Sequence, residues 1–245
     1  MNLPKLHIAV LLTNDDTSPF AAHFPNDGQK VVQLLQPLRP NWSFEVLPVK
    51  DGVLPSGPEA FDGYVITGSP ASVNDDALPW VGHLLDFIRA VDAARQPLIG
   101  LCFGHQAVAR ALGGQVVRHA AGWGLGTAPT HWQAERPWMQ PAQITTTLMA
   151  AHNEQVTRMP EGAECLGGSE FCPIGSMQIG LHIWTTQYHP EMPLVFMQAL
   201  LGYLADKLDT HTLTRAHASL QQAVDVPLFG QWMAQFIEHA RNTRP

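Results

Sequence analysis

The chain has 245 residues, of which 45% are hydrophobic and 14% charged, and its formal net charge is −7 at pH 7. This length and apolar content predict a folded domain with a sizeable core, and they exclude a disulfide-stapled miniprotein and a disordered chain. Lys and Arg number only 14 against 21 Asp and Glu, so a nucleic-acid partner is not expected.

No segment has the pattern of a membrane span or an export signal. No apolar run approaches the roughly 20 residues that a bilayer-spanning helix needs. The apolar stretch His7–Leu12 is followed at once by Asn14-Asp15-Asp16, where a signal peptide would have a small-residue cleavage site. We therefore expect a cytoplasmic protein with no membrane contact.

The first half of the chain alternates short apolar runs with longer amphipathic segments. Runs bounded by Gly or Pro predict buried strands, and apolar residues recurring at the helical period predict helices. The expected strands are His7–Leu12, Trp42–Leu47, Tyr64–Thr67 and Pro97–Leu101. The expected helices are Gln29–Leu38, Trp80–Arg95 and Gly104–Leu112. This order favours a mostly parallel sheet with helices on both faces.

The second half is expected to hold shorter strands and a helical tail. The strands are Gln115–His119, Gly126–Trp132, Gln143–Met149 and a late hairpin of Met177–Leu181 with Ile183–Tyr188. A helix is expected over Leu194–Leu208, after Pro193. A further amphipathic stretch, expected to pack on the core, carries Phe229, Trp232, Met233, Phe236 and Ile237. We expect one domain over residues 1–209 and a helical C-terminal extension packed on it over residues 210–245.

The most informative segment places Cys102 between a strand and a helix, in the pattern Gly100-Leu101-Cys102-Phe103-Gly104. This is a nucleophile elbow with Cys in place of Ser. The two glycines allow a sharp turn, and the start of the helix favours thiolate over thiol. The N–H of Phe103 would then point where an oxyanion forms. The alternative is a buried structural cysteine at an ordinary strand–helix junction.

A nucleophilic cysteine needs a base and a group that orients it. His189 ends an apolar strand, and Glu191 lies two residues later, on the same side of an extended chain. These two residues supply a base and its orienting carboxylate, as in a catalytic triad. The alternative is a surface His-Pro-Glu turn. By contrast, His105 is on the helix behind the elbow and is expected to pack in the core.

The other cysteines carry no comparable signal. Three cysteines, Cys102, Cys165 and Cys172, make no disulfide framework, and we expect the last two to be structural. No Cys-rich cluster or HxxxH pattern indicates zinc. We therefore expect neither a metal nor a cofactor.

Together, the segments Gly100–Gln106 and Gln187–Glu191 resemble the class I (triad) glutamine amidotransferase family. The order of Cys, His and Glu matches, as does the gap of 87 residues between Cys102 and His189. Tyr64–Pro70 resembles the family's oxyanion strand and loop, with Gly-Ser-Pro where many members have Gly-Gly-Pro. Ala151–Val156 resembles its substrate-side segment. The pattern is similar to the stand-alone, GMP-synthase-like amidotransferases and to γ-glutamyl peptidases.

The resemblance implies a flavodoxin-like three-layer α/β sandwich and a cysteine amidohydrolase. Its implied triad is Cys102, His189 and Glu191, with Cys102 forming a glutamyl thioester. Backbone N–H groups of Phe103 and of Gly68 or Ser69 would bind the oxyanion. Gln106 and His152 would lie near the bound glutamyl group.

Three functions remain open on the sequence. The first is hydrolysis of the γ-amide of glutamine to glutamate and ammonia, which would pass to a synthetase in trans. The second is a free-standing γ-glutamyl peptide or amine hydrolase with the same triad, its leaving group recognised by the loops around 14–27 and 120–132. The third is a catalytically silent binding or regulatory protein, against which the intact Cys, His and Glu set argues.

Overall fold

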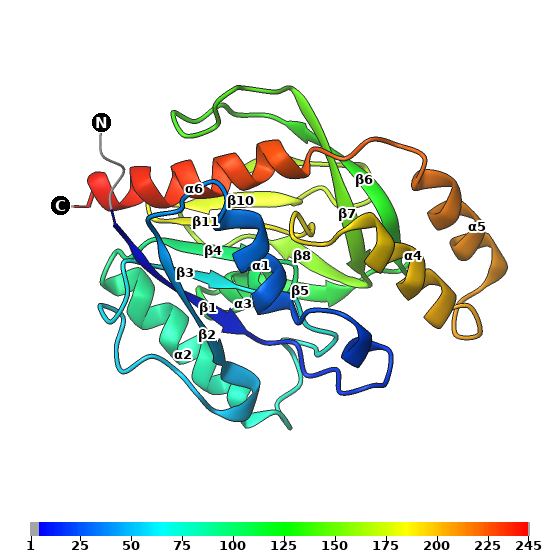
Figure 1. Ribbon diagram of the computed structural model, residues 1–245, viewed down its shortest axis with the longest axis horizontal. Helices are drawn as coiled ribbons and strands as arrows, with labels where there is room; N and C mark the ends of the chain where they lie inside the picture. Colours follow the sequence, from blue (N-terminus) through cyan, green and yellow to red (C-terminus); the bar gives the residue numbers. More distant parts are fainter. Residues whose placement is uncertain (1–4, 245) are drawn as a thin grey trace.

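A nine-stranded mixed sheet forms the centre of the protein, for which a computed structural model describes residues 5–244 (Figure 1). One half is parallel, in the spatial order β2 (Ser43–Pro48), β1 (His7–Leu12), β3 (Gly63–Ile66), β4 (Leu98–Leu101) and β11 (Ile183–Thr186). The other half continues antiparallel through β10 (Ser176–Ile179), β9 (Ala163–Gly168), β6 (Gly124–Trp132) and β7 (Thr145–His152). A separate ribbon pairs β5 (Gln115–Arg118) with β8 (Glu154–Arg158).

Helices cover both faces of the parallel half, because its strands are apolar on both sides. In β1, Ala9 and Leu11 belong to the core shared with α2 (Pro79–Ala93) and α3 (Phe103–Ala111). Ile8 and Val10 belong to the opposite core, with α1 (Asp27–Leu35) and α6 (Val226–Asn242). Such alternation is the geometry of a strand buried on both faces. The expected three-layer, flavodoxin-like α/β arrangement is confirmed.

The C-terminal helices pack on the sheet at different places. The expected stripe on α6 is confirmed, since Phe229, Trp232, Met233, Phe236 and Ile237 are all fully buried. Helices α4 (Leu194–Tyr203) and α5 (Thr210–Ser219) lie at the end of the molecule opposite the C-terminus of α6, with α5 beside β6 (Figure 1). The division of the chain at residue 209 stays a prediction.

Most expected elements occur within a few residues of their expected bounds, and two strands, β8 and β9, occur where none was expected. Helix α1 begins earlier than expected because Asn26 caps it. The Asn26 side chain accepts the N–H of Gln29 at 2.9 Å, and the Gln29 side chain accepts that of Asn26. No helix within residues 5–244 is long and apolar enough to cross a membrane.

Candidate active site

Three neighbouring parallel strands bring the predicted site residues together. Strand β4 lies between β3 and β11, with Ile99 opposite Val65 on one side and Trp184 on the other. Cys102 follows the end of β4, Gly68 follows β3, and His189 follows β11. Because the carboxyl ends of parallel strands meet at one edge of a sheet, this order places Cys102 between the predicted oxyanion loop and the predicted base.

Cys102 occupies a strained turn at the start of α3. Its backbone has φ 49° and ψ −100°, and its N–H donates to Thr186 O at 2.8 Å. A positive φ is costly for a residue with a side chain and is found most often at functional sites. A Cβ on Gly100 would lie 2.6 Å from Gly104 O, and one on Gly104 would lie 2.7 Å from Ile66 O. Both elbow glycines are therefore required by close backbone packing.

His189 and Glu191 form a buried pair. The His189 Nδ1 lies 2.7 Å from Glu191 Oε1, and both residues are nearly inaccessible to solvent. The His189 backbone N–H donates to Met149 O at 2.9 Å, which ties the residue to β7. Because the carboxylate can only accept, Nδ1 carries a proton, and the buried Nε2 has no hydrogen-bond partner among the described residues.

The charges around His189 favour its protonated form. Burial lowers the pKa of its imidazole, but the neighbouring Cys102 and Glu191 more than offset this and raise the pKa well above its ordinary value. A cationic imidazole beside a thiol is the arrangement of a thiolate–imidazolium pair. The structure therefore brings together the residues predicted as nucleophile, base and orienting group.

Gly68 makes the approach of these residues possible. A Cβ at this position would lie 2.7 Å from His189 Cε1 and 3.7 Å from Cys102 Cβ. Its carbonyl oxygen accepts hydrogen bonds from the hydroxyls of Thr13 at 3.0 Å and Thr67 at 3.2 Å. Since the carbonyl and N–H of a trans peptide point in opposite directions, these bonds turn the N–H of Ser69 away from the two threonines.

The geometry thus favours Ser69 over Gly68 as the oxyanion donor of this loop. The second predicted donor is Phe103, whose N–H is free of intrahelical bonding because it lies in the first turn of α3. The predicted oxyanion donors are therefore one N–H group of the loop and one of the helix start.

A cavity of about 200 Å³ opens beside Cys102. We call it the inner cavity, and its lining includes Ser69, Cys102, Gln106, Trp123 and His152. The Gln106 amide is already engaged, since Nε2 donates to Glu154 O at 2.8 Å and to Gln187 Oε1 at 3.2 Å. The predicted substrate residues Gln106 and His152 therefore lie in the cavity wall.

His152 is a neutral member of that wall. Burial lowers the pKa of its imidazole to about 4, with smaller contributions from its neighbours. Its Nδ1 lies 3.1 Å from Glu154 O, a carbonyl that can only accept, so Nδ1 is the protonated nitrogen and Nε2 is an acceptor. Because this residue stays neutral at physiological pH, it offers a fixed lone pair to the site.

The remaining histidine and cysteines near the elbow have structural surroundings. His105 is fully buried between Thr185 and Ile174 O, and burial lowers its pKa to about 3. The expectation that it packs is confirmed. Cys172 is buried as well, and burial with the nearby Cys102 and Cys165 raises its pKa to about 12.

Two residues of the site were not singled out from the sequence. Thr13, directly after β1, anchors Gly68 O, and Gln187 donates from Nε2 to Cys102 Sγ at 3.5 Å. Gln187 lies within the segment that suggested the base, so its position in the sequence was a usable signal. Thr13 gave no signal, because its role depends on the pairing of β1 with β3.

Comparison with known proteins decides the family. The family model "Glutamine amidotransferase class-I" matches residues 35–196, which is well over half of the chain. The chain belongs to the class-I glutamine amidotransferase family. The matched region includes Cys102, His189, Glu191 and the oxyanion loop, so the whole predicted site lies inside the family domain.

Relatives within the family have different names. The chain is 30% identical to γ-glutamyl peptidase 3 of Arabidopsis thaliana over 156 residues, covering 60% of this chain and 62% of that protein. It is 31% identical to γ-glutamyl peptidase 5 of the same plant over 210 residues, covering 78% and 77%. It is also 30% identical over 132 residues to a glutamine-hydrolysing GMP synthase subunit from Methanosarcina mazei, covering 54% and 65%. Several matches thus span about three fifths of the relative's length.

Solved structures of this family share the fold. A glutamine amidotransferase from Methylobacillus flagellatus superposes with a TM-score of 0.75 and 22% identity, covering 100% of this chain and 96% of that one. One from Thermotoga maritima has a TM-score of 0.73 and 17% identity, covering 95% and 98%. These amidotransferases therefore support the three-layer architecture.

Proposed function

We propose that this protein hydrolyses the γ-amide of glutamine through a thioester on Cys102, releasing glutamate and ammonia. The observation that carries the proposal is the His189–Glu191 pair, with its 2.7 Å contact and unpartnered Nε2, beside a cysteine held at positive φ at a helix start. Burial of both members keeps the pair out of bulk water.

The acylation half of the reaction follows from these positions. The thiol proton resides on His189 Nε2 in the thiolate–imidazolium pair, and the Cys102 thiolate forms a bond to the side-chain carbonyl carbon of glutamine. The oxygen becomes an oxyanion, which the N–H groups of Ser69 and Phe103 stabilise. The oxyanion then collapses, the C–N bond breaks, and His189 returns its proton to the departing nitrogen.

Deacylation uses the same residues. His189 removes a proton from water as the water oxygen attacks the thioester carbon, and the C–S bond then breaks. The proton taken from water stays on His189, which restores the thiolate–imidazolium pair. Glu191 stabilises the imidazolium in both halves and needs no protonation itself.

The inner cavity also suits the part of the substrate that does not react. A γ-glutamyl group keeps a free α-ammonium and a free α-carboxylate. The lining offers one charge of each sign, Arg118 and Glu154. The two residues face each other across the β5–β8 pair, so this wall of the site presents both charges that a zwitterion needs.

Cleavage of γ-glutamyl peptides is the second candidate function, because relatives named γ-glutamyl peptidases match over up to 78% of this chain. The triad chemistry is the same, with an amine in place of ammonia as leaving group. The relative named as part of a GMP synthase favours the first candidate, with ammonia passing to a synthetase in trans.

The test is glutamate release from glutamine and from γ-glutamyl dipeptides by the wild-type protein and by Cys102→Ala. We expect release by the wild type, none by the variant, and a glutamyl adduct on Cys102 when turnover is quenched with acid. Preference for glutamine supports the amidotransferase function, and preference for a dipeptide supports the peptidase function. Release that survives in Cys102→Ala would contradict both.

A further inference from the structure

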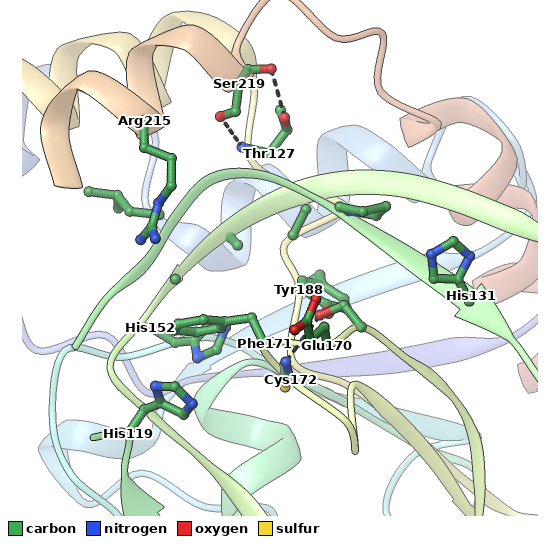
Figure 2. A pocket seen from close by; sticks show the side chains of 16 residues that line it. His119, Thr127, His131, His152, Glu170, Phe171, Cys172, Tyr188, Arg215 and Ser219 are labelled. Atoms are coloured by element: carbon green, nitrogen blue, oxygen red, sulfur yellow. Dashed lines mark hydrogen bonds between the residues drawn. The ribbon is translucent and has the colours of Figure 1, made fainter. Parts of the chain in front are cut away.

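A second and larger cavity, of about 630 Å³, lies next to the inner cavity. We call it the outer cavity. It is bounded by strand β6, by the loop 169–172 and by helix α5 (Figure 2). His152 lines both cavities, and the adjacent residues Trp123 and Gly124 line the inner and the outer cavity respectively. The two spaces therefore adjoin at His152.

The junction between the cavities is narrow. A Cβ on Gly124 would lie 2.8 Å from Phe171 Cε1 and 2.9 Å from His152 Nε2. Glycine thus leaves room where any larger residue would press on the His152 acceptor. The Phe171 ring lies against His119, with centroids 4.2 Å apart, and against His152 at 5.8 Å. An aromatic wall therefore extends outward from the junction.

The outer cavity exists because most of β6 does not pair with β9. Strand β6 pairs with β7 from Gly124 to His131 but with β9 only at His131 and Trp132. Helix α5 covers part of the open edge: Thr127 N donates to Ser219 Oγ at 2.9 Å, and Thr127 Oγ1 donates to Ser219 O at 2.7 Å. These bonds fix the helix as one side of the cavity.

Arg215 brings a positive charge to this cavity. Its side chain reaches from α5 toward the space above His152 and Phe171 (Figure 2), and Nη2 donates to Trp123 O at 3.0 Å. A guanidinium has five N–H donors, so one backbone contact leaves most of them available. Among the ion pairs formed within residues 5–244, none includes Arg215. A carboxylate is the group that its planar fork binds best.

Building on the second candidate function, we propose that the outer cavity binds the leaving group of a γ-glutamyl peptide, an amino acid or short peptide with a free carboxylate. The carboxylate pairs with Arg215, and an apolar side chain packs against Phe171. His152 Nε2 accepts the N–H of the scissile amide at the junction. Glutamine uses only the inner cavity, since its leaving group is ammonia.

The first experiment measures binding in the Cys102→Ala background, so that it does not depend on turnover. The probes are γ-glutamylphenylalanine, its C-terminal carboxamide and glutamine, each titrated by calorimetry. Adding Arg215→Gln should weaken binding of the free-carboxylate dipeptide about tenfold, as loss of a charge-assisted contact does, and leave the other two probes within about twofold. The control is Arg89→Gln, another exposed arginine that contacts a backbone carbonyl, Ala111 O; it pairs with Asp86 and does not line the outer cavity.

The second experiment uses the active protein. Gly124→Ala should lower kcat/KM for the dipeptide at least tenfold more than kcat/KM for glutamine, because the added methyl narrows the junction. The proposal is overturned if Arg215→Gln weakens all three probes equally or none of them, or if Gly124→Ala slows both substrates to the same extent. Binding of the dipeptide through Arg215 without glutamate release from any compound would leave the cavity assigned and overturn the proposed function. Failure of every probe to bind would overturn both.

Discussion

Gly68 lies so close to His189 that a Cβ on the glycine would stand 2.7 Å from the imidazole Cε1. Gly68→Ala keeps an allowed backbone but displaces the ring from the thiol of Cys102. We expect kcat for glutamate release to fall at least about 100-fold, because small misplacements of a general base cost that much. Steady-state kinetics with circular dichroism will separate this loss from unfolding.

A matched control is Gly82→Ala on the exposed side of α2, where a Cβ would have no neighbour within 4 Å. It should leave activity unchanged and stabilise the protein by about 0.5–1 kcal/mol, as replacing a helical glycine does. Wild-type activity in Gly68→Ala would show that the ring has room to move and that this contact does not position the base.

The Thr13 hydroxyl, which donates to Gly68 O at 3.0 Å, should matter for rate rather than for substrate affinity. Thr13→Val keeps the shape of the side chain but removes one of the two hydroxyls that hold Gly68 O, so the Gly68–Ser69 peptide is held less firmly. Loss of an aligned oxyanion donor lowers kcat by a factor of about 10²–10³, and we expect the decrease in kcat of Thr13→Val to stay within that factor. Measured KM for glutamine should stay within a few-fold.

Thr13→Ser retains the hydroxyl and should retain most of the activity. Equal losses in the serine and valine variants would mean that packing of the methyl group, and not the hydrogen bond to Gly68 O, explains the effect.

The raised pKa of His189 predicts a specific pH profile. Cys102 and Glu191 raise the pKa of the His189 imidazole above its ordinary value. Activity should therefore persist as pH rises, until the imidazolium of His189 loses its proton. Glu191→Gln removes one of the two stabilising charges, and the alkaline limb of kcat/KM should move to lower pH. The rate of Cys102 alkylation by iodoacetamide, measured over the same range, provides an independent readout. An alkaline limb that stays in place would show that Glu191 does not set the charge of His189.

Two buried neutral histidines predict a loss of stability in acid. The pKa of His105 is lowered to about 3 and that of His152 to about 4, whereas both titrate near 6.5 when unfolded. The unfolded chain therefore binds more protons below pH 6.5, and the free energy of unfolding should fall by about 1.4 kcal/mol per pH unit for each histidine. Below the folded-state pKa values, these two histidines no longer lower the free energy of unfolding further.

Urea denaturation at pH 7.0 and pH 5.0 measures this slope. His105→Gln removes one of these groups, so its slope should be smaller than that of the wild type by about 1.4 kcal/mol per pH unit, even though it starts from a lower stability. A slope in the variant equal to that of the wild type would mean that the buried His105 is not the titrating group.

The sequence alone determined the elements around the nucleophile. The Gly100, Cys102 and Gly104 pattern specifies a turn through local backbone conformation. The pairing of His189 with Glu191 was predicted for an extended chain, but it occurs across a turn in which Met192 N–H donates to His189 O at 3.4 Å. Regular strand and helix periods likewise revealed the parallel half of the sheet. These features depend on residues that are close together in the chain.

Other features depend on which segments meet, and only the tertiary structure decided them. Strands β8 and β9 contain few apolar residues, and the polar Gln155 and Glu164 interrupt them, so the sequence shows no clear alternation there. These strands form because β8 pairs with β5 and β9 pairs with β10. The hydrogen bond from the Thr13 hydroxyl to Gly68 O forms only because β1 pairs with β3. The outer cavity needs β6 to separate from β9 and α5 to lie over the gap. Non-local pairing of this kind leaves no periodic pattern in the sequence, because the energy that fixes it comes from contacts formed only on folding.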